Sequence, residues 1–78
     1  MNNEEILSKV VALFATMTDA DEITEESELM EDLGISSMDV LFLISGLEAE
    51  FGVKIPERDI RQVVTVSDVI DIIAERIE

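Results

Sequence analysis

The sequence has 78 residues and a formal net charge of -14, from 19 acidic and 5 basic side chains, and it contains neither cysteine nor histidine. These absences exclude disulfides, thiolate metal sites, and the Ser-His and Cys-His nucleophile pairs, so we expect neither a catalytic residue nor a metal site. The negative charge repels nucleic acid and anionic membranes and favours protein partners with basic docking surfaces.

The chain shows no repeat, low-complexity tract or Gly/Ser linker, and 47% of its residues are hydrophobic. We therefore expect one domain over residues 1–78, and a monomer, with a core that needs no disulfide or metal. The N-terminus is acidic where a secretory signal is basic, and the longest apolar run, residues 40–44, is too short to span a bilayer. A cytoplasmic protein is the expectation.

The first predicted element is a helix over residues 4–17, capped by Asn2 or Asn3. Its apolar residues recur at helical spacing: Ile6, Val10, Leu13 and Met17. A long acidic connection follows over residues 18–35. We expect this connection to pack across the other elements through isolated apolar anchors, which are Ile23, Leu29, Met30, Leu33 and Ile35.

A second helix is predicted from Ser36, as its N-cap, to about Phe51, because Asp39 stands three residues on and completes a variant of the capping box. Gly52 ends this helix, and Pro56 opens a short third helix that reaches about Gln62.

The last predicted helix begins after Thr65, with Asp68 repeating the cap pattern, and ends near Ile77. Residues 63–73 are rich in β-branched side chains, so a strand and an α/β fold are an alternative. The spacing of the apolar residues favours a helix, since they step by four, three and four: Val66, Ile70, Ile73 and Ile77. The prediction is an all-α, small four-helix bundle with a long first loop and a short third helix.

Ser37 is expected at the first position of the second helix, directly after a turn that contains Gly34. A hydroxyl at that position is exposed, and the unpaired N–H groups and positive dipole end of the helix would stabilise a phosphodiester formed on it. The simpler interpretation is that Ser36 and Ser37 only begin a helix.

The surrounding motifs decide between these interpretations. The stretch of residues 32–39, Asp-Leu-Gly-Ile-Ser-Ser-Met-Asp, is followed by residues 47–56 and 64–68 in an order and spacing that resemble the acyl carrier protein family. The family pattern is Asp-Leu-Gly-x-Asp-Ser-Leu-Asp, and the resemblance implies that Ser37 carries 4'-phosphopantetheine. Here Ser36 replaces the usual Asp and Met38 the usual Leu, and neither change removes the Ser37 hydroxyl.

The resemblance implies a freestanding, non-catalytic carrier that is itself the substrate of a phosphopantetheinyl transferase, which uses coenzyme A. Acyl intermediates would be held as thioesters on the arm and presented to acyl-loading and acyl-processing enzymes of fatty-acid, polyketide or related biosynthesis. The nearest alternative is an aminoacyl or peptidyl carrier. A further alternative is an unmodified acidic helical module that binds protein partners. An EF-hand is disfavoured, because the acidic loop lacks the required ligand spacing.

The helical spacing puts Val40, Ile44, Leu47 and Phe51 on one face of the second helix, the core face, with Leu43 at its edge. On the opposite face, the family commonly has acids where this chain has Phe42 and Ala49. Phe42 either folds under the long loop or binds an apolar surface of a dedicated enzyme. The predicted partner-binding residues are Ser36, Met38, Asp39, Leu41, Phe42, Ser45, Glu48, Ala49, Arg58 and Arg61.

Arg58 and Arg61 also stand where similar carriers often have acids, which together with Phe42 indicates a specialised pathway. If the cargo is sheltered, the resemblance points to an apolar cleft between the second and third helices. The predicted lining of that cleft is Leu47, Ile55, Ile60 and Val63.

Overall fold

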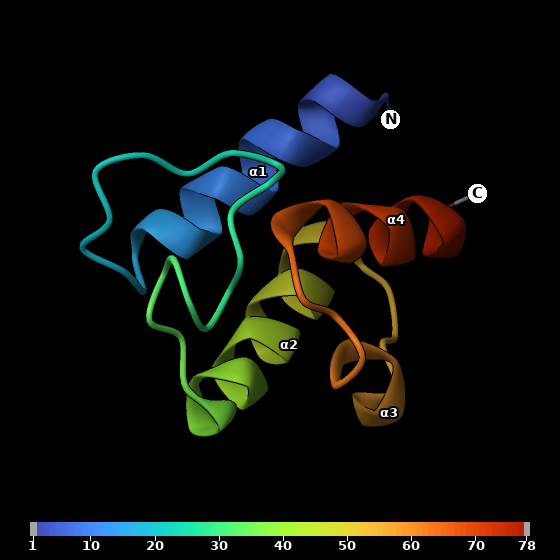
Figure 1. Cartoon of the computed structure of the whole chain (residues 1–78). Helices are drawn as coiled ribbons and strands as arrows, with labels where there is room; N and C mark the ends of the chain where they lie inside the picture. The colour runs from blue at the N-terminus through green and yellow to red at the C-terminus, as the bar shows by residue number, and fades with distance from the viewer. Residues whose placement is uncertain (1, 78) are drawn as a thin grey trace.

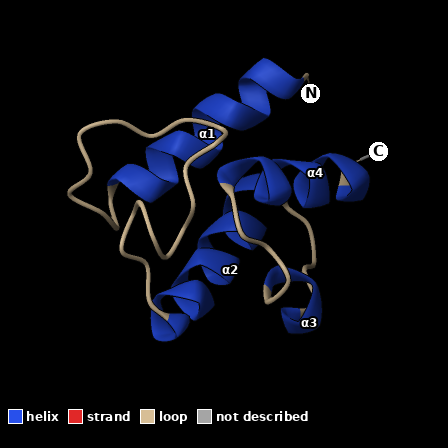
Figure 2. Cartoon of the chain, viewed as in Figure 1, coloured by secondary structure: helices blue, strands red, loops and turns tan. Residues whose placement is uncertain are grey.

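The computed structural model describes residues 2–77 and contains, within them, four helices and no strand. The helices are α1 (Asn3–Ala15), α2 (Ser37–Phe51), α3 (Glu57–Ile60) and α4 (Val66–Arg76). Figure 1 shows α1, α2 and α4 grouped together, with α3 as a short turn to one side. Figure 2 shows that a long loop connects α1 to α2. The predicted all-α fold is confirmed, including the helical rather than extended state of residues 66–76.

The core lies where α1 packs against both α2 and α4. Each of these helices contributes buried apolar side chains: Ile6, Val10 and Phe14 from α1, Leu43 and Leu47 from α2, and Val66, Val69, Ile70 and Ile73 from α4. The predicted core face of α2 is rotated in the structure. Leu43 lies at its centre rather than its edge, while Val40, Ile44 and Phe51 are only partly buried. The reason is that α2 contacts α3 as well as α1, so its apolar surface covers a wider arc than a single stripe.

The connection between α1 and α2 is pinned to the segment that precedes α4. Leu29 donates its N–H to the carbonyl of Val64 at 2.9 Å, and Val66 donates to the carbonyl of Ser27 at 3.0 Å. Leu29, Leu33 and Ile35 are buried as anchors, and Ile23 is partly buried. Met30 was predicted as an anchor and is not one, because it is 61% exposed. The chain makes an antiparallel bridge between Glu28 and Thr65 and then turns over residues 29–33, and this turn leaves Leu29 buried and Met30 exposed.

The helix ends agree closely with the predicted signals. Asn2 caps α1, its side-chain oxygen accepting from the Glu5 N–H at 2.9 Å. α1 ends at Ala15, two residues before Met17, and α3 ends at Ile60, two residues before Gln62. Gly52 ends α2 in the left-handed conformation with φ 66°, a conformation that favours glycine.

The capping box of α4 fixes residues 64 and 65, the segment with which the loop between α1 and α2 pairs. Thr65 Oγ1 accepts from the Asp68 N–H at 3.3 Å, and Asp68 Oδ2 accepts from the N–H groups of Val64 and Thr65 at 2.9 and 3.1 Å. The hydrogen bond from Val64 and then that from Thr65 lower the pKa of the Asp68 carboxyl below 3.8, against a smaller opposing effect of burial.

We predict that Asp68→Ala lowers the free energy of unfolding at pH 7 by about 1 kcal/mol, the usual cost of a lost cap. The folded-state pKa of Asp68 is lowered, so its contribution is complete above the unfolded-state pKa and disappears as pH falls through the folded-state value. Urea unfolding at pH 7 and at pH 2.5 measures both effects. Asp71→Ala, which removes an exposed acid from the same helix, is the control for net charge. Equal losses in the two variants at pH 7 would contradict the capping role.

Candidate functional site

The turn before α2 holds the start of that helix in a fixed place. Gly34 has φ 67°, a left-handed conformation that costs other residues free energy and that glycine adopts freely. Ile35 follows it, buried in the core, and donates its N–H to the carbonyl of Leu29 at 2.9 Å. The buried Ile35 side chain therefore anchors the residue directly before Ser36, and the chain emerges at the surface at that point.

Ser36 and Asp39 form the predicted capping box. Ser36 Oγ accepts from the Asp39 N–H at 3.2 Å, and Asp39 Oδ2 accepts from the Ser36 N–H at 3.0 Å. The Ser36 hydroxyl is therefore already engaged in holding the helix terminus. Of the two interpretations for this serine pair, the structural one describes Ser36.

Ser37 is the first residue of α2, and its side chain is exposed. The first α-helical hydrogen bond of this helix runs from the Val40 N–H to the Ser36 carbonyl, at 3.2 Å. The N–H groups of Ser37 and Met38 come before this first hydrogen bond, so they have no partner within the helix. They lie at the positive end of the helix dipole. An anionic group attached to the Ser37 oxygen would lie beside these donors.

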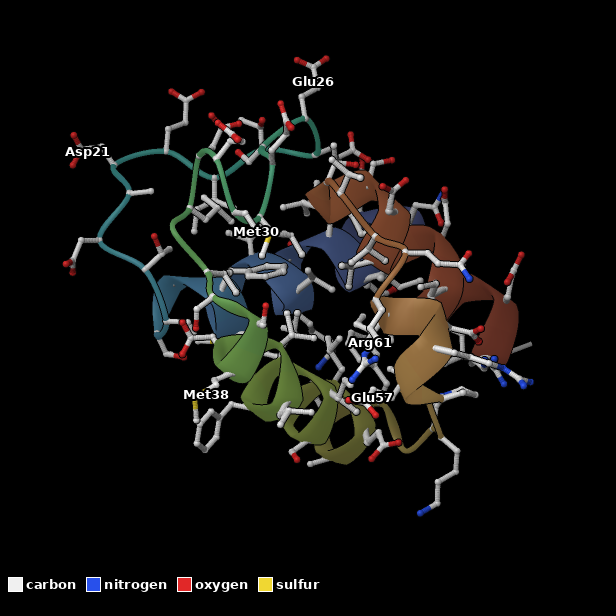
Figure 3. The ribbon with its side chains drawn as sticks, turned by 60° about the horizontal axis from the view of Figure 1, so that its bottom comes forward. Asp21, Glu26, Met30, Met38, Glu57 and Arg61 are labelled. Carbon is white, nitrogen blue, oxygen red and sulfur yellow. The ribbon has the colours of Figure 1, made fainter. Side chains whose placement is uncertain are left out.

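Ser37 is one of the residues that line an open pocket of about 490 Å³ between α2, α3 and the loop that connects α1 to α2. Its wall is mostly apolar and consists of Leu29, Met30, Ser37, Met38, Val40, Leu41, Glu57, Ile60, Arg61 and Val63. Figure 3 shows Glu57 and Arg61 side by side, with their side chains between the ribbons of α2 and α3. The volume and the mostly apolar wall of this pocket suit a ligand that is largely apolar.

The structure divides the predicted cleft residues into two pairs. Ile60 and Val63 line this pocket. Leu47 and Ile55 are 0% and 4% exposed, belong to the core, and are not part of the pocket wall. Sequence reasoning missed Leu29, Met30 and Val40, because the loop approaches α2 through a backbone pairing with residues 64–66 that no local pattern reveals.

The predicted outward face of α2 is exposed in the structure. Met38, Leu41 and Phe42 form what we call the apolar patch, with exposures of 73%, 52% and 70%. The alternative in which Phe42 folds under the long loop is wrong, since a side chain this exposed is not covered. Ser45 and Ala49 are exposed further along the helix.

Other residues predicted to bind partners have contacts within the chain. Glu48 is half-buried and accepts from the Ile55 N–H at 2.8 Å, which ties α2 to the segment before α3. Arg61 pairs with Glu57 at 3.0 Å, and Arg58 is exposed on α3.

Residues 2–77 contain neither a cluster of metal-ligating side chains nor a helix that could span a membrane. That part of the chain has no cluster of three or more acidic side chains placed to hold a metal ion. Figure 3 shows Asp21 and Glu26 of the long loop at the outside of the molecule. None of the four helices in these residues is long and apolar enough to cross a membrane.

Comparison with known proteins identifies the group to which this geometry belongs. Residues 8–73 match the sequence family described as "Phosphopantetheine attachment site". The acyl carrier protein of Thermotoga maritima is 37% identical over 78 residues, covering 97% of this chain and 96% of that protein. The acyl carrier protein of Thermosynechococcus vestitus is 40% identical over 79 residues, covering 99% and 98%.

Solved structures give the same result. The acyl carrier protein from Enterococcus faecalis superposes with a TM-score of 0.79 at 32% identity, covering 96% of this chain and 98% of the other. A putative acyl carrier protein from Mycobacterium tuberculosis gives a TM-score of 0.73 at 34% identity, covering 94% and 95%. With an exposed serine at a helix start, an adjacent apolar pocket and these relatives, the chain belongs to the acyl carrier protein family, whose cofactor is covalently bound 4'-phosphopantetheine.

Proposed function

We propose that Ser37 is the attachment site of the phosphopantetheine arm and that Ser36 is not. The observation that carries this assignment is the contrast between the two hydroxyls. Ser36 Oγ is bound to the Asp39 N–H at 3.2 Å, whereas Ser37 is exposed at the first position of α2. A hydroxyl engaged in a cap is held by the helix that it stabilises, and a free one can enter the active site of a modifying enzyme.

The residues around Ser37 fit such a group. The N–H groups of Ser37 and Met38 can donate to a phosphate oxygen, and the helix dipole favours the negative charge. The mostly apolar wall of the pocket beside Ser37 can contact the remainder of the arm or its cargo. When bound, the group supplies a terminal thiol that carries acyl chains as thioesters, a function for which this chain has no cysteine.

In this function the chain catalyses no reaction. Ser37 is a substrate for a phosphopantetheinyl transferase, and the loaded carrier presents its cargo to acyl-loading and acyl-processing enzymes of fatty-acid, polyketide or related biosynthesis. The carrier is proposed to serve a specialised pathway, because its partner-facing residues include an exposed Phe42 and the cations Arg58 and Arg61 where similar carriers commonly have acids.

The apo protein, incubated with coenzyme A and a broad-specificity transferase, is expected to gain one phosphopantetheinyl group by mass spectrometry. Ser37→Ala is expected to gain none, and Ser36→Ala to gain one. Unfolding measurements on the same variants should show the reverse order. Loss of the cap in Ser36→Ala costs about 1 kcal/mol, and Ser37→Ala stays within about 0.5 kcal/mol of the parent chain.

This pair of variants separates structure from modification, since each serine is expected to affect one readout and spare the other. Modification of Ser37→Ala would place the arm elsewhere. A parent chain that takes up no group at all would support an unmodified interaction module instead.

The apolar patch is proposed as the surface that partner enzymes bind. It adjoins Ser37 and exposes Met38, Leu41 and Phe42 to solvent. Single exposed apolar side chains are ordinary, but a contiguous set of them beside a functional residue marks an interaction site. Aromatic and methionine side chains are enriched in the cores of protein interfaces. The apolar rather than acidic character of this patch predicts an apolar partner surface opposite Phe42.

Phe42→Glu is expected to lower kcat/KM for acyl transfer by the cognate acyl-loading enzyme about tenfold, because a buried interface anchor is lost. Phe42→Leu keeps an apolar side chain and is expected to retain most of the activity. Ser8→Glu, at an exposed position of α1, controls for the added charge. An increase in rate for Phe42→Glu would indicate a basic partner surface and refute the apolar one.

A further inference from the structure

Arg61 and Glu57 are the charged residues on the wall of the pocket beside Ser37, and every other wall residue apart from Ser37 is apolar. Arg61 follows the last turn of α3, and Glu57 begins that helix. The Arg61 Nη2 atom lies 3.0 Å from Glu57 Oε1. Figure 3 places both side chains at the gap between α2 and α3 rather than on the outer side of α3.

The ion pair leaves most of the hydrogen-bonding capacity of Arg61 unused. A guanidinium carries several N–H donors in a planar fork, and the contact with Glu57 occupies one of its nitrogens. The Arg61 side chain is 71% exposed, so its remaining donors face water or a ligand in the pocket. An exposed pair with i,i+4 spacing contributes little to stability, and fold stability alone therefore gives no strong reason for a cation at this position.

The negative charge around the pocket determines which kind of cargo oxygen can accept a hydrogen bond from Arg61. A carboxylate on the cargo would approach Glu57 and enter the field of a chain with net charge -14. A neutral keto or hydroxyl oxygen accepts the same hydrogen bond without that repulsion. The apolar wall formed by residues such as Leu41, Ile60 and Val63 disfavours water and accommodates the methylene part of a chain.

We propose that Arg61 is a cargo-recognition residue that donates a hydrogen bond to a neutral oxygen on an acyl chain lying in this pocket. The preferred cargo is an acyl chain that carries a hydroxyl or keto group, over a saturated chain of the same length. Glu57 positions the guanidinium through the 3.0 Å contact. This inference rests on the proposed attachment at Ser37, because that residue lines the pocket.

The test uses the full chain, loaded at Ser37 by a broad-specificity transferase from octanoyl-coenzyme A or from 3-hydroxyoctanoyl-coenzyme A. Cleavage of each thioester by hydroxylamine is followed by mass spectrometry, and the rate in each variant is divided by the rate in the parent chain. Arg61→Gln is expected to speed cleavage of the hydroxyacyl form roughly fivefold, the effect of losing about one hydrogen bond that holds the cargo in the pocket. The ratio for the octanoyl form should stay near one.

Lys54→Gln is the matched control, since it removes one positive charge from an exposed side chain near α3 that does not line the pocket. Both of its ratios should stay near one. A second readout is the Arg61 Nε–Hε resonance, which should shift between the octanoyl and hydroxyoctanoyl forms of the parent chain. A purely structural arginine would not respond to a single cargo hydroxyl.

The failures are distinguishable. If the parent chain takes up neither cargo, attachment at Ser37 fails, and this inference fails with it. If both cargoes load but Arg61→Gln changes the two rates by the same factor, or the Nε–Hε resonance is the same in both forms, Arg61 does not recognise the cargo and the attachment site stands.

Discussion

The structure around the functional site depends on the reciprocal cap at the start of α2. Ser36 and Asp39 satisfy each other's backbone N–H groups at 3.2 and 3.0 Å, which fixes where the helix begins. Because the helix begins there, Ser37 is its first residue and lies outside the core, next to the unpaired donors of the first turn. Two adjacent serines thus have different surroundings, since the Ser36 hydroxyl is engaged in the cap and Ser37 is exposed. The family pattern usually has Asp where this chain has Ser36, and the serine keeps the capping function while removing one negative charge from the site.

The cap is held in place by contacts that reach the other end of the chain. Ile35 is buried and bonded to Leu29, and Leu29 is bonded to Val64, just before the capping box of α4. A helix start, a loop and a second helix start are therefore connected through a few backbone hydrogen bonds and buried side chains. Met30 lies in the turn that follows this pairing and lines the pocket, so the packing that stabilises the bundle also shapes the space beside Ser37. The highly charged loop between α1 and α2 is held in place by its buried anchors Leu29, Leu33 and Ile35.

Local signals predicted the helices well. Three of the four N-caps are made by the side chains of Asn2, Ser36 and Thr65, each of which the sequence marked as a candidate, and the step pattern of α4 outweighed its β-branched composition. What failed depends on tertiary contacts. The core face of α2 is centred on Leu43 because that helix packs against two neighbours. The pocket wall includes Leu29 rather than Leu47 and Ile55 because the loop pairs with residues 64–66, a contact between distant parts of the chain. The capping signal and the family motif together predicted different roles for Ser36 and Ser37, and the hydrogen bonds between Ser36 and Asp39 confirm the capping part of that prediction.

A crystal structure of the phosphopantetheinylated protein is the most direct test of this division. It should show continuous density from Ser37 Oγ into the arm, a phosphate oxygen within hydrogen-bonding distance of an N–H group of the first turn of α2, and Ser36 Oγ still bound to the Asp39 N–H. Density that leaves Ser36 Oγ, or a capping box broken by the attached group, would contradict the account.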